Sequence, residues 1–199
     1  MAGPLVGFHE THTLDQHVAL IKGQLDKSLR DGELRQLAVK IVSGNYDHAV
    51  DPRTGKSAPV VRAYGKTFRA PPGDPCKARD DRCELERIWD FTVLNFRYVY
   101  DPADVDTFAT AKESLIAGGG DCDDGVVLIG ALAGFVGFRV IARVISTKDD
   151  PANWVHIYPL VGITKDDPQE WVPLDMTVQG AVPGWEYPGI GRYRDYHMV

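Results

Sequence analysis

A single apolar run constrains the fold of this chain more than any other feature of its sequence. Residues 126–136 read VVLIGALAGFV, with glycines at which neighbouring elements can approach closely. The run is apolar on all sides and too short to cross a bilayer, so it predicts a central helix buried on every face. The polar residues GGGDCDD precede it, and the glycines at 118–120 allow a sharp turn into Cys122.

Composition places the chain among globular proteins and excludes some partners. Hydrophobic residues make up 44% of the 199 residues, charged residues 25%, and the net charge is −6, without a run of Lys and Arg. We therefore expect one well-cored domain, with no nucleic acid and no membrane among its partners. The N-terminal stretch lacks the pattern of a signal peptide, so we expect a cytoplasmic protein with reduced thiols.

The chain is predicted to be a single domain, residues 1–199, with four successive parts. These parts are two N-terminal helices (1–44), a long irregular connection (45–83), the core (84–177) and an aromatic Gly/Pro tail of irregular structure (178–199). Capping-box patterns begin helices at Thr13 and Thr110, and only residues 60–64 indicate a strand within the connection. In the core we expect a helix over 84–98 before the central helix, and strands over 138–144, 154–163 and 171–177 after it.

Cys122 lies in the first turn of the central helix rather than inside the apolar run. Backbone N–H groups and the positive end of the helix dipole favour a thiolate at this position. A cysteine that served only to fill the core would be expected among the apolar residues instead. The position therefore suits a nucleophile, provided that a base can reach it.

Two strands downstream supply a candidate base and its partner. A period of two places His156 on one face of the strand WVHIY, and Asp175 on one face of the strand WVPLD. If the two strands form a hairpin whose turn centres between Lys165 and Asp166, His156 and Asp175 lie directly opposite each other. A Cys–His–Asp arrangement of this kind forms a thiolate–imidazolium pair for acyl chemistry.

These sequence blocks resemble the transglutaminase-like cysteine protease superfamily over residues 84–177. The blocks are GDCDD at the start of an apolar helix, GFRVIAR, WVHIY and WVPLDMT. The resemblance implies an α+β fold with a papain-like core, in which a central helix carrying the cysteine packs on an antiparallel sheet. It implies that Cys122 is the nucleophile, His156 the general base and acid, and Asp175 the residue that orients the imidazole.

Three interpretations of the acidic residues around Cys122 remain open. They can cap the start of the helix, or Asp123 or Asp124 can pair with Arg139 or Arg143. Alternatively, Asp121 and Asp123 can ligate calcium, as carboxylates next to the cysteine do in the related periplasmic adhesin-cleaving proteases of bacteria. We rank capping first and calcium last, and otherwise expect no cofactor.

Several other residues have open or minor assignments. The oxyanion hole is expected to use the backbone N–H of Cys122 and a side chain of the preceding helix, either Trp89 or Asn95. Cys76 and Cys83 can be unpaired surface thiols, a disulfide or half of a zinc site. The remaining histidines are interpreted as solvated, and two tail aromatics as a possible lid over the cleft. These histidines are His9, His12, His17, His48 and His197, and the tail aromatics are Trp185 and Tyr187.

The expected function is that of a cysteine hydrolase that cleaves amide bonds in a protein or peptide substrate through a thioester acyl-enzyme. A true transglutaminase would use the same triad, and only the acceptor distinguishes the two reactions. The layout of the chain resembles that of small members encoded in phage and prophage genomes. This implies phage virion proteins as partners, and it leaves a third alternative, a virion structural or assembly protein that retains the fold for binding.

Overall fold

The central helix of the computed structural model is α5 (Cys122–Phe135), and the other elements are arranged around it. The structure describes residues 13–50, 53–101 and 107–199. The other helices are α1 (Leu14–Ser28), α2 (Gly32–Ser43), α3 (Asp81–Asn95) and α4 (Ala111–Ala117). The strands are β1 (Asp47–Val50), β2 (Ser57–Ala63), β3 (Lys66–Arg69), β4 (Arg97–Tyr98), β5 (Gly119–Gly120), β6 (Val140–Thr147), β7 (His156–Ile163), β8 (Glu170–Pro173) and β9 (Ile190–His197). The fold is therefore mixed α+β with mainly antiparallel sheets.

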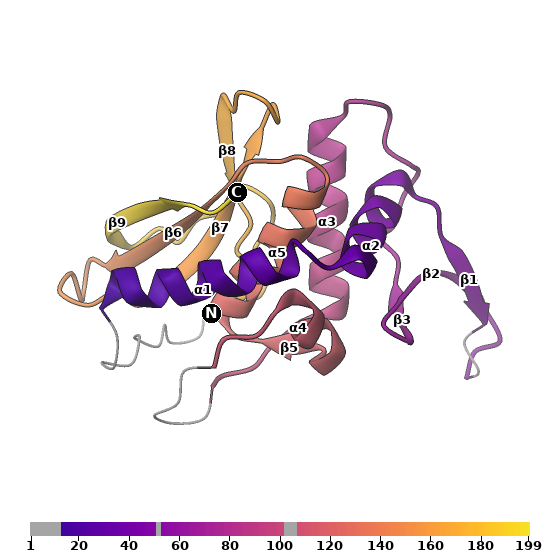
Figure 1. Ribbon diagram of the computed structural model, residues 1–199, viewed down its shortest axis with the longest axis horizontal. Helices are drawn as coiled ribbons and strands as arrows, with labels where there is room; N and C mark the ends of the chain where they lie inside the picture. The colour runs from indigo at the N-terminus through magenta and orange to yellow at the C-terminus, as the bar shows by residue number, and fades with distance from the viewer. Residues whose placement is uncertain (1–12, 51–52, 102–106) are drawn as a thin grey trace.

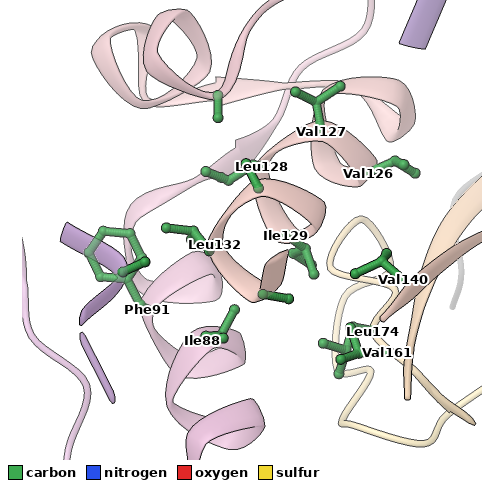
Figure 2. Packing of buried hydrophobic residues seen from close by; sticks show 14 of the residues in the cluster. Ile88, Phe91, Val126, Val127, Leu128, Ile129, Leu132, Val140, Val161 and Leu174 are labelled. Carbon is green, nitrogen blue, oxygen red and sulfur yellow. The ribbon is translucent and has the colours of Figure 1, made fainter. Parts of the chain in front are cut away.

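The apolar run forms the predicted buried helix. Residues 126–129 and 131–133 of α5 are at most 2% exposed. Figure 2 shows Leu132 pointing toward Ile88 and Phe91 of α3, whereas Ile129 points toward Val140 of the sheet. In Figure 1, α5 lies between the other helices and the four-stranded sheet of order β8-β7-β6-β9. This packing fixes the N-terminal end of α5, which carries Cys122, beside the sheet.

The local signals for helix ends are confirmed. Thr13 and Thr110 each form a complete capping box, and Gly44 ends α2 with a φ of 68°, a left-handed conformation that glycine adopts without strain. The helix predicted over 84–98 is displaced toward the N-terminus, since α3 runs from Asp81 to Asn95 with its N-cap at Asp80. Asp80 accepts a hydrogen bond from the backbone N–H of Cys83, which explains the earlier start.

The predicted hairpin is present, but its register is different. Leu160 pairs with Pro173 and Val161 with Val172, so the turn centres between Asp166 and Asp167. Continuing this register would place Thr177, not Asp175, opposite His156. Because the shift is two residues, every side chain keeps its face of the sheet. The strand predicted over 171–177 ends at Pro173, so Asp175 lies just beyond it.

The interpretation of residues 178–199 as irregular structure is wrong for their second half. β9 pairs antiparallel with β6, the pairs including Ile141 with His197 and Ile145 with Tyr193. The part of the tail before β9 covers the sheet face that points away from α5. There Tyr187 packs against a second apolar cluster that includes Tyr158, and the suggestion of a lid over the cleft stays a prediction. Trp185 is half-buried in the same tail segment.

The connection over 45–83 is also more regular than predicted. β1, β2 and β3 form a three-stranded antiparallel sheet, which Figure 1 shows at the opposite end of the molecule from β9. Asn95 joins this sheet to α3, because its side chain accepts a hydrogen bond from the Arg69 N–H at 2.8 Å and donates one to the Arg69 carbonyl at 2.9 Å. The predicted Asp51–Pro52 turn lies outside the described residues, and so do His9 and His12, two of the histidines interpreted as solvated.

A disulfide joins Cys76 and Cys83 and settles the choice that the spacing left open. It ties the end of the connection to the first turn of α3. The expectation of reduced thiols is wrong for this pair, because the two sulfurs are bonded to each other. Cys122 is the free cysteine. Within the described ranges, no helix has the length and apolar character needed to cross a membrane.

Candidate functional site

Asp121 is the N-cap residue of α5 and stabilises the first turn of the helix. Its carboxylate accepts hydrogen bonds from the backbone N–H groups of Asp123 and Asp124 at 3.0 and 3.3 Å, and the Asp124 carboxylate reaches back to the Asp121 N–H. This capping box confirms the interpretation ranked first for the acidic residues. Burial, with the charges of Asp123 and Asp124, raises the pKa of Asp121 to about 8, and burial raises that of Asp124 to about 6.

His156 and Asp175 form a buried pair at the end of the sheet. His156 Nε2 lies 2.8 Å from Asp175 Oδ2, and the two residues are 4% and 2% exposed. The other carboxylate oxygen, Oδ1, accepts hydrogen bonds from the Thr177 hydroxyl at 2.7 Å and the Thr177 N–H at 3.2 Å. Although burial opposes ionisation, the attraction of His156 and these hydrogen bonds together lower the pKa of Asp175. Asp175 is therefore held as a carboxylate against the imidazole.

The Cys122 sulfur lies beside the start of β7, next to Ile157, the residue that follows His156 in the chain. It faces the backbone N–H of Ile157, which stabilises a thiolate, and it is close enough to Asp175 for that carboxylate to disfavour one. Asp175 occupies Nε2 of His156, so Nδ1 is the ring nitrogen that does not face this carboxylate. The structure thus places Cys122, His156 and Asp175 at one end of α5 and the sheet.

The prediction of a thiolate favoured by the helix dipole is wrong for this conformation. Burial, followed by the negative charges of Asp123 and Asp121, raises the pKa of the Cys122 thiol well above its ordinary value. A helix N-terminus offers about half a positive charge, which does not balance desolvation and nearby carboxylates. The sulfur therefore rests as a neutral thiol and needs a base to become a nucleophile.

Asp123 has a partner that the sequence did not reveal. His17 Nε2, on α1, lies 2.7 Å from Asp123 Oδ2, and both side chains are nearly fully buried. The Cys122 sulfur lies 3.7 Å from the other carboxylate oxygen of Asp123, Oδ1. The interpretation of His17 as solvated is wrong. Its burial was detectable, because position 17 shares the apolar stripe of α1 with Leu14 and Ile21.

The arginine partners suggested for the acidic residues are wrong. Arg143 binds Asp195 and Glu186, at 2.8 and 2.9 Å, on the sheet. Arg139 lines a different pocket, formed with residues of the β7–β8 turn and the C-terminus. The Asp124 carboxylate instead accepts a hydrogen bond from the Ala109 N–H at 2.9 Å.

The calcium interpretation finds little support in the surroundings of Asp121 and Asp123. One donor atom from each of Asp121, Cys122 and Asp123 lies within 4.8 Å of the others. Asp121 caps the helix and has a raised pKa, and Asp123 is paired with His17. Calcium takes six to eight oxygen ligands, mainly ionised carboxylates and carbonyls. Both carboxylates are thus accounted for by contacts within the protein.

Neither side chain suggested for the oxyanion hole is well placed to act there. The Asn95 amide donates hydrogen bonds to the carbonyls of Arg69 and Phe91, so it holds β3 to α3. Trp89 is 6% exposed and lies in the hydrophobic core. The backbone N–H of Cys122 remains the donor expected at the helix start.

Tyr98 is a site residue that the sequence analysis missed. It pairs with Gly120 in the parallel β4–β5 ladder, two residues before Cys122. Burial raises the pKa of Tyr98, and the charges of Cys122 and Asp121 add to this shift, which places the phenol near the sulfur. Its ring also contacts Tyr100 edge-on at 4.8 Å. The β4–β5 pairing brings Tyr98 to the site, and no sequence spacing predicted that pairing.

A pocket of about 830 Å³ opens beside the loop that leads to Cys122. Gly118, Gly119, Gly120, Asp124 and Tyr100 are among the residues that line it. Glycines have no side chain, so another chain can approach the backbone closely at these three positions. A volume of this size suits a drug-sized molecule or a few residues of a peptide.

Comparisons of the chain with protein-family models, with curated proteins and with solved structures gave no match.

Proposed function

We propose that this chain is a cysteine hydrolase that cleaves amide bonds in a protein or peptide through a thioester acyl-enzyme. The observation that carries the proposal is the buried pair of His156 and Asp175, 2.8 Å apart, next to the helix end that presents the free thiol of Cys122. A buried histidine–carboxylate pair beside a cysteine is the arrangement that acyl transfer to sulfur requires. The layout agrees with a papain-like core of the transglutaminase-like superfamily, which we propose as the fold family.

In the proposed reaction, His156 moves the proton that limits the reactivity of Cys122. His156 Nδ1 takes the thiol proton as the sulfur bonds to the carbonyl carbon of the substrate, and Asp175 stabilises the imidazolium. The imidazolium then protonates the departing amine as the C–N bond breaks, which leaves a thioester on Cys122. His156 next removes a proton from water, the water oxygen attacks the thioester carbonyl, and the carboxylate product leaves as the thiol is restored.

The site requires a base because of its burial and its charge. Burial of the sulfur, followed by the charges of Asp123 and Asp121, disfavours a permanent thiolate, so deprotonation has to accompany attack. The developing oxyanion would be bound by the backbone N–H of Cys122, because the N–H groups of Asp123 and Asp124 are already bound to the Asp121 carboxylate. The phenol of Tyr98 is the nearby side-chain donor that this proposal assigns to the same role. The pocket beside β5 does not include Cys122 in its lining, and this proposal assigns it to substrate residues farther from the reacting bond.

Incubation of the chain with a mixture of short internally quenched peptides tests this proposal, with fluorescence to follow cleavage and mass spectrometry to detect the acyl-enzyme. The parent chain should release fluorescence and carry an acyl adduct on Cys122, whereas Cys122→Ala should show neither. His48→Ala, a change on exposed β1, should behave as the parent. Full hydrolysis by Cys122→Ala would contradict the proposal. If methylamine increases turnover and appears in the product, the acyl group is transferred to amines, which is the transglutaminase alternative.

A further inference from the structure

His17 and Asp123 form a buried polar pair between α1 and α5, although other contacts already hold α1 in the fold. Both side chains are buried, and taking polar or charged groups out of water costs free energy that their mutual contact at 2.7 Å has to offset. The apolar residues Val18, Ile21 and Leu25 already anchor α1 in the core. Lys22 also binds the Met198 carbonyl at 2.7 Å, so α1 is fixed without the pair.

The pair lies in contact with the nucleophile. Asp123 bridges the two groups, because Oδ2 faces His17 at 2.7 Å and Oδ1 faces the Cys122 sulfur at 3.7 Å. Phe108 packs edge-on against His17, with ring centroids 5.0 Å apart, and holds the imidazole in place. Two histidine–aspartate pairs therefore lie near Cys122, and the proposed reaction gives a role only to that of His156.

We propose that His17 is a positioning residue that controls the reactivity of Cys122 by neutralising and holding the Asp123 carboxylate beside the sulfur. The inference rests on the proposed function in that it takes Cys122 as the nucleophile. A carboxylate next to a thiol opposes its ionisation, and a cation on the far side of that carboxylate offsets the opposition. α1, which lies outside the Cys–His–Asp core, thereby sets how easily the thiol loses its proton.

The other titratable groups around the sulfur come from several elements. They are Tyr98 from β4, Asp121 at the N-cap of α5, and Asp175 from the segment after β8, with His156 of β7 paired to Asp175. Asp121, Asp123 and Asp175 each oppose ionisation of the thiol. His17 faces Asp123 directly, so a proton on this imidazole acts on the thiol through that carboxylate.

The pH dependence of Cys122 alkylation by iodoacetamide separates this role from a structural one. His17→Gln can keep a polar contact with Asp123 but loses the charge. We expect its alkylation rate at a given pH to fall about ten-fold, equivalent to a rise of about one unit in the apparent pKa of the thiol. Asp123→Asn should change the rate in the opposite direction. Added to Asp123→Asn, His17→Gln should have no further effect, because the carboxylate through which it acts is gone.

The controls make each outcome decisive. His48→Gln, on exposed β1, should keep the parent profile, and His17→Lys should restore most of it, because a cation again faces Asp123. A His17→Gln profile identical to that of His48→Gln, or an equal loss in the Asp123→Asn background, would overturn the proposal. If the substitutions at position 17 unfold the chain, the Asp123→Asn profile becomes the test. An Asp123→Asn alkylation profile equal to that of the parent would overturn the proposal. A chain that shows the shifts but cleaves no peptide would contradict the proposed function and leave this inference standing.

Discussion

Replacing Asp175 by asparagine should lower kcat/KM for peptide hydrolysis by about 10³–10⁴-fold while the chain stays folded. Oδ1 of residue 175 is fixed as an acceptor by the hydroxyl and the N–H of Thr177. The asparagine amide would therefore present its NH₂ group to His156 Nε2, where the carboxylate now accepts. His156 would accept at Nε2 and carry its proton on Nδ1, the nitrogen that takes the thiol proton in the proposed reaction, so it could not act as the base.

The measurement is kcat/KM on the quenched peptides, with circular dichroism to check the fold. Asp166→Asn in the exposed turn of the same hairpin is the matched control and should retain full activity. If Asp175→Asn kept activity within a factor of ten, the carboxylate would not be selecting the tautomer of His156. The role assigned to Asp175 would then be wrong.

Replacing Gly119 by alanine should lower the free energy of unfolding by about 3 kcal/mol, at the upper end of the usual cost of overpacking. A Cβ at position 119 would lie 2.5 Å from the Arg97 carbonyl oxygen and 3.0 Å from Val99 Cγ2. The first of these atoms belongs to the backbone of β4 and cannot rotate away. The β4–β5 ladder would have to open, and β5 leads directly into Asp121 and Cys122.

Urea denaturation measures the change in stability, and peptide hydrolysis measures its effect on the site. We expect hydrolysis to fall at least ten-fold, because a displacement of about 1 Å at a nucleophile can cost 10²-fold. Gly23→Ala is the control of opposite sign, since no atom lies within 4 Å of its new Cβ in the middle of α1. It should raise the free energy of unfolding by roughly 0.5–1 kcal/mol. A Gly119→Ala variant as stable and active as the parent would contradict the packing described for β4 and β5.

The elements that sequence alone predicted are those whose signals are local. The buried helix follows from an uninterrupted apolar run, and the capping boxes at Thr13 and Thr110 follow from residues three positions apart. The β7–β8 hairpin was also predictable, because turn residues separate two apolar strands. Its exact register was not, because a shift of two residues keeps every side chain on its face and leaves the hydrophobic pattern unchanged.

The elements that sequence did not predict depend on contacts between distant segments. β9 is almost wholly exposed along Gly191–Asp195, so it has no alternating pattern, and pairing with β6 supplies its backbone partners. The pairing of Cys76 with Cys83 depends on the path of the connection, which six intervening residues do not determine. The charge at Cys122 was misjudged for the same reason, because the buried carboxylates outweigh the dipole only once the helix is packed.

The rate of Cys122 alkylation by iodoacetamide at pH 7, compared between the parent and His156→Ala, tests the central claim most directly. Cys76 and Cys83 are joined in a disulfide, so Cys122 is the free thiol, and mass spectrometry can confirm the site of modification. We predict at least ten-fold slower alkylation in His156→Ala, because its thiol would lie among carboxylates without a base. His48→Ala should react as the parent does. Equal rates in the parent and His156→Ala, with the fold intact, would show that His156 does not activate Cys122, and the proposed hydrolase mechanism would be wrong.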